Sequence, residues 1–96
     1  MENTLQAMFI STNKQQLDQL SKFLISEHFE VSRPEMLNTS SNTVLYAIYT
    51  PDPHQKGLRA YAIQYVENNY LNNIFMFDRE RNLKPICTRK KLDFNR

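Results

Sequence analysis

The chain has 96 residues, of which 41% are hydrophobic and 23% are charged, and its formal net charge is +2 at pH 7. This length supports one hydrophobic core but not two, so we expect a single domain over residues 1–96, with residues 89–96 as a fraying tail. The apolar fraction is close to the average for globular proteins, which excludes an intrinsically disordered chain.

The composition also excludes several kinds of site. The single cysteine, Cys87, cannot form an internal disulfide, and with two histidines it is too little for a closed zinc site. The single glycine, Gly57, excludes a glycine-rich phosphate-binding loop and a dinucleotide fingerprint. The sequence has no signal peptide pattern and no run of about 18 apolar residues. We therefore expect a cytoplasmic protein with no membrane contact, no cofactor and no metal.

The N-terminal part predicts a strand followed by a helix. Residues 5–10 (LQAMFI) are apolar on both faces, which is typical of an interior strand. Thr12 and Gln15 fit a capping box, in which the side-chain oxygen accepts a hydrogen bond from the first helical turn. The helix should run from about residue 13 to 28, with one apolar stripe packed on a sheet: Leu17, Leu20, Phe23, Leu24 and Ile25.

Five further strands are predicted after this helix. Residues 29–33 (FEVSR) alternate apolar and polar, and Pro34 places them at a sheet edge or a strand end. A polar loop at 38–42 leads to four segments that read as an antiparallel meander: 43–50, 58–67, 73–78 and 83–88. Gly57 is the natural position for a positive φ, and Asn82 suits a left-handed turn.

Residues 58–67 (LRAYAIQYVE) allow a second assignment. Leu58, Tyr61, Ala62, Tyr65 and Val66 also fit one stripe of a helix, so periodicity does not separate the two structures. The tyrosine, isoleucine and valine content favours a strand. The predicted fold is therefore α+β, with one N-terminal helix on a mostly antiparallel sheet of five or six strands, in the order β-α-β-β-β-β-β.

No residue pattern indicates an enzyme. His28 and His54 lie far apart, and neither has metal-ligand spacing. Asp52 and His54 share a loop, but a general base also needs a nucleophile and a pocket. Cys87 reads as a small buried hydrophobe, with a reactive thiol beside Lys84, Arg89 and Lys90 as the alternative. We predict no catalytic residues.

The distribution of charge and the positions of three tyrosines predict a candidate partner-binding site. Residues 79–96 carry a net charge of +5, whereas the remaining residues carry −3. On a strand, Tyr61 and Tyr65 point the same way, and Tyr46 could join them on the sheet face opposite the helix. The candidate partner-binding residues are Tyr46, Tyr61, Tyr65, Arg79, Arg81, Arg89, Lys90 and Lys91. A solvated final hairpin with lysines guarding its edge is the plainer interpretation of the same charges.

The expected function is a small non-enzymatic protein that binds an acidic protein surface, such as an inhibitor, adaptor or immunity-type regulator encoded by a bacterium, a phage or a mobile element. Tyrosine and arginine are typical of protein-binding hot spots. The alternative is a nucleic-acid-binding protein, because aromatic residues beside cations also hold single strands. Homodimerisation through the exposed sheet face or an edge strand is a further possibility.

Overall fold

The computed structural model describes residues 4–37 and 42–86 of the chain. In these ranges it forms an α+β fold with one antiparallel sheet and two helices. The elements are β1 (Gln6–Ser11), α1 (Lys14–Ser26), β2 (Glu35–Leu37), β3 (Leu45–Thr50), α2 (Leu58–Asn68), β4 (Phe75–Phe77) and β5 (Leu83–Pro85).

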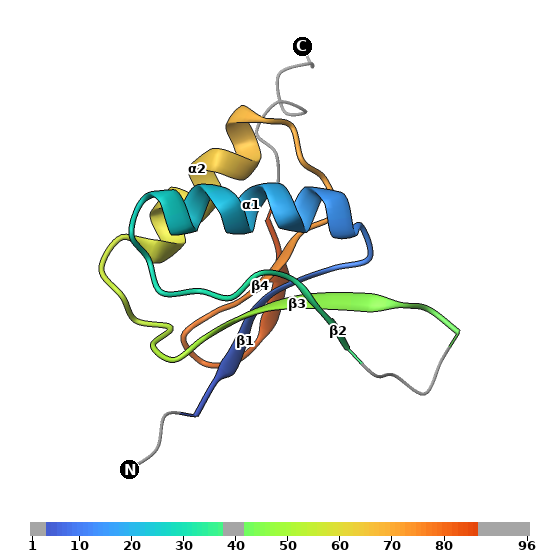
Figure 1. The fold of residues 1–96 in the computed structure, drawn as a ribbon, viewed down its shortest axis with the longest axis horizontal. Coiled ribbons are helices and arrows are strands. Elements are labelled where there is room, and N and C mark those ends of the chain that lie inside the picture. Colours follow the sequence, from blue (N-terminus) through green and yellow to red (C-terminus); the bar gives the residue numbers. More distant parts are fainter. Residues whose placement is uncertain (1–3, 38–41, 87–96) are drawn as a thin grey trace.

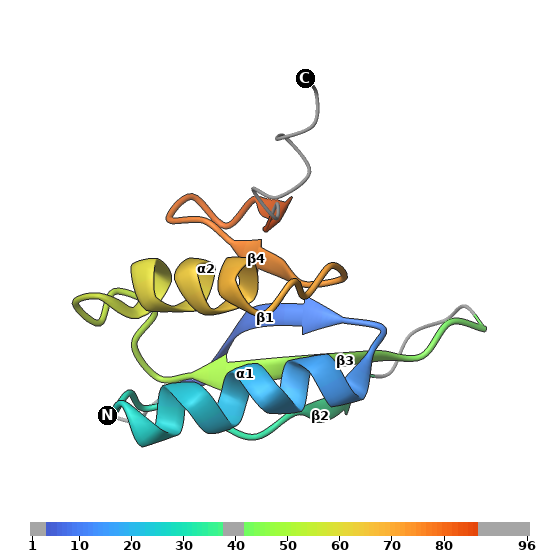
Figure 2. The same ribbon diagram turned by 90° about the horizontal axis from the view of Figure 1, so that it is seen from above.

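The strands lie in the order β2-β3-β1-β4-β5, and both helices lie on the same face of the sheet (Figures 1 and 2). α1 packs against β1 and β3 and also against α2. The first six elements therefore have the split β-α-β arrangement, β-α-β-β-α-β, in which the first strand occupies the middle of the sheet. β5 adds a fifth strand by a tight turn after β4.

β1 is the interior strand that its two apolar faces predicted. Ile10 is opposite Ala47 of β3 on one side and opposite Phe75 of β4 on the other. A register shift between Ala7 and Phe9 inserts Met8 as a β-bulge. Met8 and Phe9 consequently both join the core under the helices, although they are consecutive.

The predicted N-terminal helix is confirmed as α1, with different end residues. Asn13, rather than Thr12, caps the helix, because its side chain accepts a hydrogen bond from the Gln16 amide at 3.1 Å. Leu17, Leu20 and Leu24 are fully buried along one stripe, whereas Ile25 is 41% exposed and does not belong to it. The helix ends at Ser26 in a Schellman motif, with the Phe29 amide donating to the Leu24 carbonyl and His28 in the left-handed conformation at φ 71°.

The strand predicted over residues 58–67 is wrong, because this segment is the helix α2. Leu58, Ala62 and Val66 recur every four residues and are fully buried between α1 and the sheet. β-propensity is a weak preference, and the packing of this stripe outweighs it. Gly57 does take the positive φ that was expected, at 87°, as the N-cap of α2.

Two further predictions about the sheet are wrong. The segment at 29–33 is extended and its Ser32 amide donates to the Tyr49 carbonyl at 2.8 Å, but the regular strand β2 begins only after Pro34, at Glu35. The four-stranded meander is also wrong. α2 carries the chain from β3 over β1, so that β4 pairs with the opposite side of β1. β3, β4 and β5 are confirmed as strands, in shorter form than predicted.

The two faces of the sheet differ in what covers them. Lys14 of α1 lies over the Tyr46 ring, 5.9 Å from Nζ to the ring centre, so Tyr46 is on the helix side. Alternation along β3 then puts Ala47 and Tyr49 on the opposite side, which neither helix covers. Residues that pair directly share a face. We define the open face as Ala7 and Ile10 of β1, Leu45, Ala47 and Tyr49 of β3, Glu35 and Leu37 of β2, Phe75 and Phe77 of β4, and Leu83 and Pro85 of β5.

Replacing Gly57 with alanine should lower the free energy of unfolding by about 1 kcal/mol, because an L-residue at φ 87° is strained. The added Cβ would lie 3.5 Å from the Tyr61 ring, which is ordinary contact, so the loss comes from the backbone. Gly57→Asn is the matched control. Asparagine tolerates this conformation better and should lose less in a urea titration. An alanine variant as stable as wild type would contradict the positive φ.

Candidate binding surface

Five cations gather where α2 begins and where the chain turns from β4 into β5. They are Lys56, Arg59, Arg79, Arg81 and Lys84, which we call the basic end. Arg79 and Arg81 are residues that the sequence predicted. The other three cations, Lys56, Arg59 and Lys84, were not predicted as site residues. Lys56 and Arg59 join the site because residues 58–67 form a helix that begins beside Lys56.

The turn between β4 and β5 is held by Asp78. Its Oδ1 accepts hydrogen bonds from the backbone amides of Glu80 and Asn82, each at 2.9 Å. These contacts, led by the one with Asn82, lower the pKa of the Asp78 carboxyl, and an ion pair with Lys84 at 3.4 Å adds to them. The left-handed residue of the turn is Arg81, at φ 66°, rather than Asn82 as predicted.

Arg59 links α2 to β4 without neutralising its own charge. Its Nη1 donates to the Phe77 carbonyl at 2.7 Å, and its Nε is buried with no hydrogen-bond partner in the described part of the chain. Burial lowers the pKa of Arg59, and repulsion from Arg79 lowers it further. The Asp78 carboxylate, which opposes this effect, already serves the turn amides and Lys84.

A surface hollow of about 420 Å³ lies beside Arg59, with Lys56, Gly57 and Arg79 in its lining. The first turn of α2 contains no acidic residue, and Gly57 supplies no side-chain cap. The positive end of the helix dipole therefore adds to the charges of the lysine and the two arginines. A carboxylate or phosphate entering this hollow would meet a positive potential from all of these groups.

Arg81 joins the basic end to the open face of the sheet. Its guanidinium lies 4.4 Å from the centre of the Phe77 ring, and Nη1 donates to the Ala7 carbonyl at 3.2 Å. The Arg81 side chain is thus fixed across the end of β1 and β4, with the rest of the guanidinium available to solvent. Cations and apolar surface are continuous at this corner of the molecule.

The predicted tyrosine surface does not form. Tyr46 is on the helix side of β3, half-buried beneath Lys14. Tyr61 and Tyr65 are on α2, where Tyr65 stacks on Phe23 with ring centres 4.5 Å apart and Tyr61 is 44% exposed. These three residues therefore do not share the sheet face opposite the helices. The aromatic residues that do lie there are Tyr49, Phe75 and Phe77.

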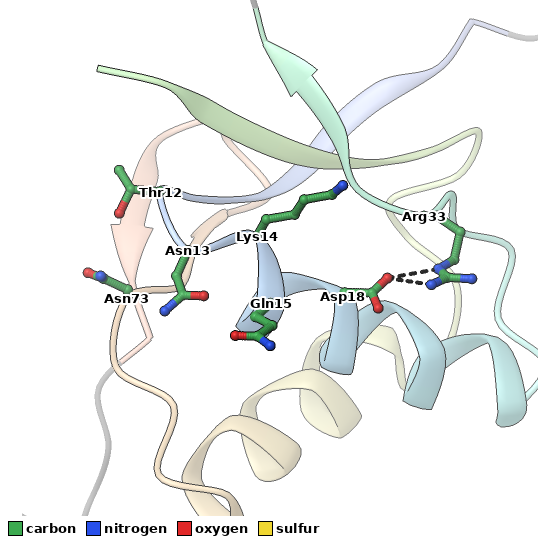
Figure 3. A pocket seen from close by; sticks show the side chains of 7 residues that line it. All are labelled: Thr12, Asn13, Lys14, Gln15, Asp18, Arg33 and Asn73. Carbon is green, nitrogen blue, oxygen red and sulfur yellow. Dashed lines mark hydrogen bonds and ion pairs between the residues drawn. The ribbon is translucent and has the colours of Figure 1, made fainter. Parts of the chain in front are cut away.

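Another hollow, of about 740 Å³, opens at the start of α1 (Figure 3). It is lined by Thr12, Asn13, Lys14, Gln15, Asp18, Arg33 and Asn73. Arg33 donates to the Asp18 carboxylate, from Nε at 3.0 Å, and this contact lowers the pKa of Asp18. Because Arg33 pairs with Asp18, only Lys14 remains as an unbalanced charge, so this hollow has a smaller excess of positive charge than the basic end.

The described residues contain no group of three or more histidine, cysteine, aspartate or glutamate side chains that could hold a metal ion. Asp52 accepts a hydrogen bond from the His54 backbone amide at 2.9 Å, which is a turn contact. No helix within the ranges 4–37 and 42–86 is long and apolar enough to cross a membrane. Cys87, Arg89, Lys90 and Lys91 lie outside the described residues.

A scan of the chain against protein-family models found no match, and searches of curated proteins and of solved structures also found none.

Tyr65→Ala should lower the free energy of unfolding by about 2 kcal/mol, because it removes a half-buried ring stacked on Phe23. Tyr61→Ala is the matched control, since that ring is 6.3 Å from Phe23 and more exposed. Chemical denaturation of both variants measures the difference. A larger loss at Tyr61 than at Tyr65 would contradict this packing.

The β4–β5 turn should loosen in acid. The folded-state pKa of Asp78 is lowered, so the carboxylate stabilises the turn at neutral pH and loses this effect as the pH falls through that lowered pKa. Amide signals of Glu80 and Asn82, followed by NMR from pH 7 downward, should shift together with the Asp78 carboxyl. Lys84→Gln should leave the pKa below its ordinary value, since the turn amides are the main cause. An ordinary pKa in that variant would assign the effect to the ion pair instead.

Proposed function

We propose that this chain is a non-enzymatic binding protein that acts on a protein partner with an acidic surface, as an inhibitor, adaptor or regulator. The observation that carries the proposal is the basic end: cations from two elements far apart in sequence converge around one hollow at the start of α2. The carboxylates of an acidic loop placed there would face Lys56, Arg59 and Arg79 together.

The arrangement favours recognition of carboxylates by geometry as well as by charge. Arginine presents a planar set of donors that matches a carboxylate, and Arg79 is exposed beside the hollow. Arg81 is positioned by Phe77 and by the Ala7 carbonyl, so less side-chain entropy is lost when it binds. Complementary charges at such a site mainly raise the association rate and select the partner.

Arg79→Glu should weaken partner binding about tenfold and slow association, because it reverses the charge beside the hollow. To find the partner, a photo-crosslinking amino acid replaces Glu80, which lies next to Arg79 and is exposed, and nuclease-treated lysate of the natural host is irradiated. A protein captured there is then purified and titrated calorimetrically with wild type and with Arg79→Glu.

Lys22→Glu is the matched control. It makes the same change in net charge on α1, where Lys22 pairs with Asp18 at 3.6 Å, and it should bind like wild type. Equal weakening by both variants would reduce the effect to net charge. Unchanged binding in Arg79→Glu would remove the basic end from the interface.

A second candidate is single-stranded nucleic acid. It is favoured by one observation: the Arg81 guanidinium lies on Phe77 beside the exposed Phe75, and aromatic rings with cations provide stacking platforms. A fluorescent single-stranded RNA, titrated at several salt concentrations, separates the candidates. Phosphate contacts make the logarithm of the affinity fall linearly with the logarithm of the salt concentration. No binding at low salt would exclude this candidate.

A further inference from the structure

Arg59 and Arg79 lie close together at the basic end, and their charges are not neutralised. Both residues line the hollow of about 420 Å³ at the start of α2, and both also line an adjoining hollow of about 380 Å³. Neither arginine forms an ion pair within the described part of the chain. After burial, repulsion from Arg79 is the main cause that lowers the pKa of Arg59. Two like charges held together in this way favour an anion placed between them.

The Arg59 side chain is already held in position for such a contact. Its Nη1 donates to the Phe77 carbonyl at 2.7 Å, which fixes the guanidinium against β4. Its Nε is buried without a hydrogen-bond partner in the described residues, so the chain itself compensates this charge poorly. The donors that remain on the two Nη atoms can bind an anion in the hollow at little further cost in side-chain entropy.

The residues around the hollow suit a phosphate group even better than a carboxylate. Lys56, Arg59 and Arg79 surround it with positive charge, and none of the described residues that line it carries a carboxylate. Gly57 has no side chain to cap the first turn of α2, so the backbone amides of this turn are additional donors. A phosphate monoester brings roughly two negative charges and three acceptor oxygens to one point, which is more than a carboxylate offers.

We propose that this hollow binds a phosphorylated side chain of the protein partner, with Arg59 and Arg79 on the phosphate oxygens and Lys56 as an additional positive charge. Planar guanidinium groups bind phosphate oxygens with paired hydrogen bonds. A monoester concentrates its charge on one group, whereas each diester phosphate along a nucleic acid carries about one charge. The proposal rests on the proposed function and adds the chemical group that the basic end recognises. Phosphorylation of the partner would strengthen binding, because an unmodified hydroxyl brings no charge to the hollow.

A titration in phosphate-free buffer tests this assignment, with the amide signals of Gly57, Arg59 and Ala60 followed by NMR. The probes are an otherwise uncharged peptide with phosphoserine at its centre and the same peptide with serine or glutamate at that position. The phosphoserine peptide should bind about tenfold more tightly than the glutamate peptide, because of its extra charge and acceptor oxygen. Equal affinities, or no saturation by the phosphoserine peptide up to about 5 mM, would overturn the proposal.

Arg79→Gln should weaken binding of the phosphoserine peptide about tenfold, because it removes one of the two guanidinium groups. Lys22→Gln is the matched control. It removes one positive charge from α1, where Lys22 pairs with Asp18, and it should bind like wild type. Arg59→Lys keeps the charge but not the planar donors, so it should also weaken binding, and circular dichroism establishes that each variant is folded. Equal affinities of Arg79→Gln and Lys22→Gln would contradict the arginine pair as the site.

Phosphatase treatment of the captured partner separates this proposal from the proposed function. The treated partner should bind about tenfold more weakly than the untreated one. If it binds as tightly as before and Arg79→Glu still weakens it, the acidic-partner function stands and the phosphate proposal is wrong.

The end of a nucleic acid is the other source of a phosphate monoester. A short single-stranded RNA with a 5′-phosphate is therefore compared with the same RNA carrying a 5′-hydroxyl, using the same amide signals. The two forms should bind alike, and more weakly than the phosphoserine peptide. A 5′-phosphorylated RNA that binds more tightly than this peptide would assign the hollow to nucleic acid and overturn its assignment to a phosphorylated protein.

Discussion

One extra residue in β1 determines which side chains lie on each of the two faces of the sheet. The bulge at Met8 places Met8 and Phe9 together under the helices, and it leaves Ala7 and Ile10 for the other side of the sheet. Because β1 occupies the middle of the sheet, β3 and β4 both depend on its register. The bulge therefore determines both which residues join the core under the helices and which residues lie on the open face.

Much of the architecture follows from the sequence, and most of the error comes from one segment. The apolar faces of residues 5–10 and the leucine stripe of α1 predicted an interior strand and a packed helix, and both are confirmed. Residues 58–67 fit two periods equally, and β-propensity favoured the wrong one. A strand there makes a simple meander, whereas a helix carries the chain over β1. One local ambiguity thus changed the strand order and the placement of Tyr61 and Tyr65.

The candidate site was predictable in charge but not in shape. The asymmetry of charge along the chain predicted Arg79 and Arg81 as site residues. Arg59 joins them only because α2 begins next to it. Apart from Gly57, the residues with a left-handed backbone conformation were also not predicted from the sequence. His28 and Tyr70 end the two helices in Schellman motifs where glycine is the usual residue, and Arg81 occupies the turn position expected for Asn82. In a chain with one glycine, residue type gives little warning of such positions, because tertiary packing decides them.

Within the residues that the structure describes, the two edge strands of the sheet limit pairing with other molecules. β2 and β5 are each three residues long, and they carry Glu35 and Pro85. A glutamate and a proline on such short margins give an incoming strand little backbone to pair with, which is how natural sheets avoid joining laterally into fibres. The open face can therefore remain apolar while the edge strands β2 and β5 limit polymerisation through strand pairing.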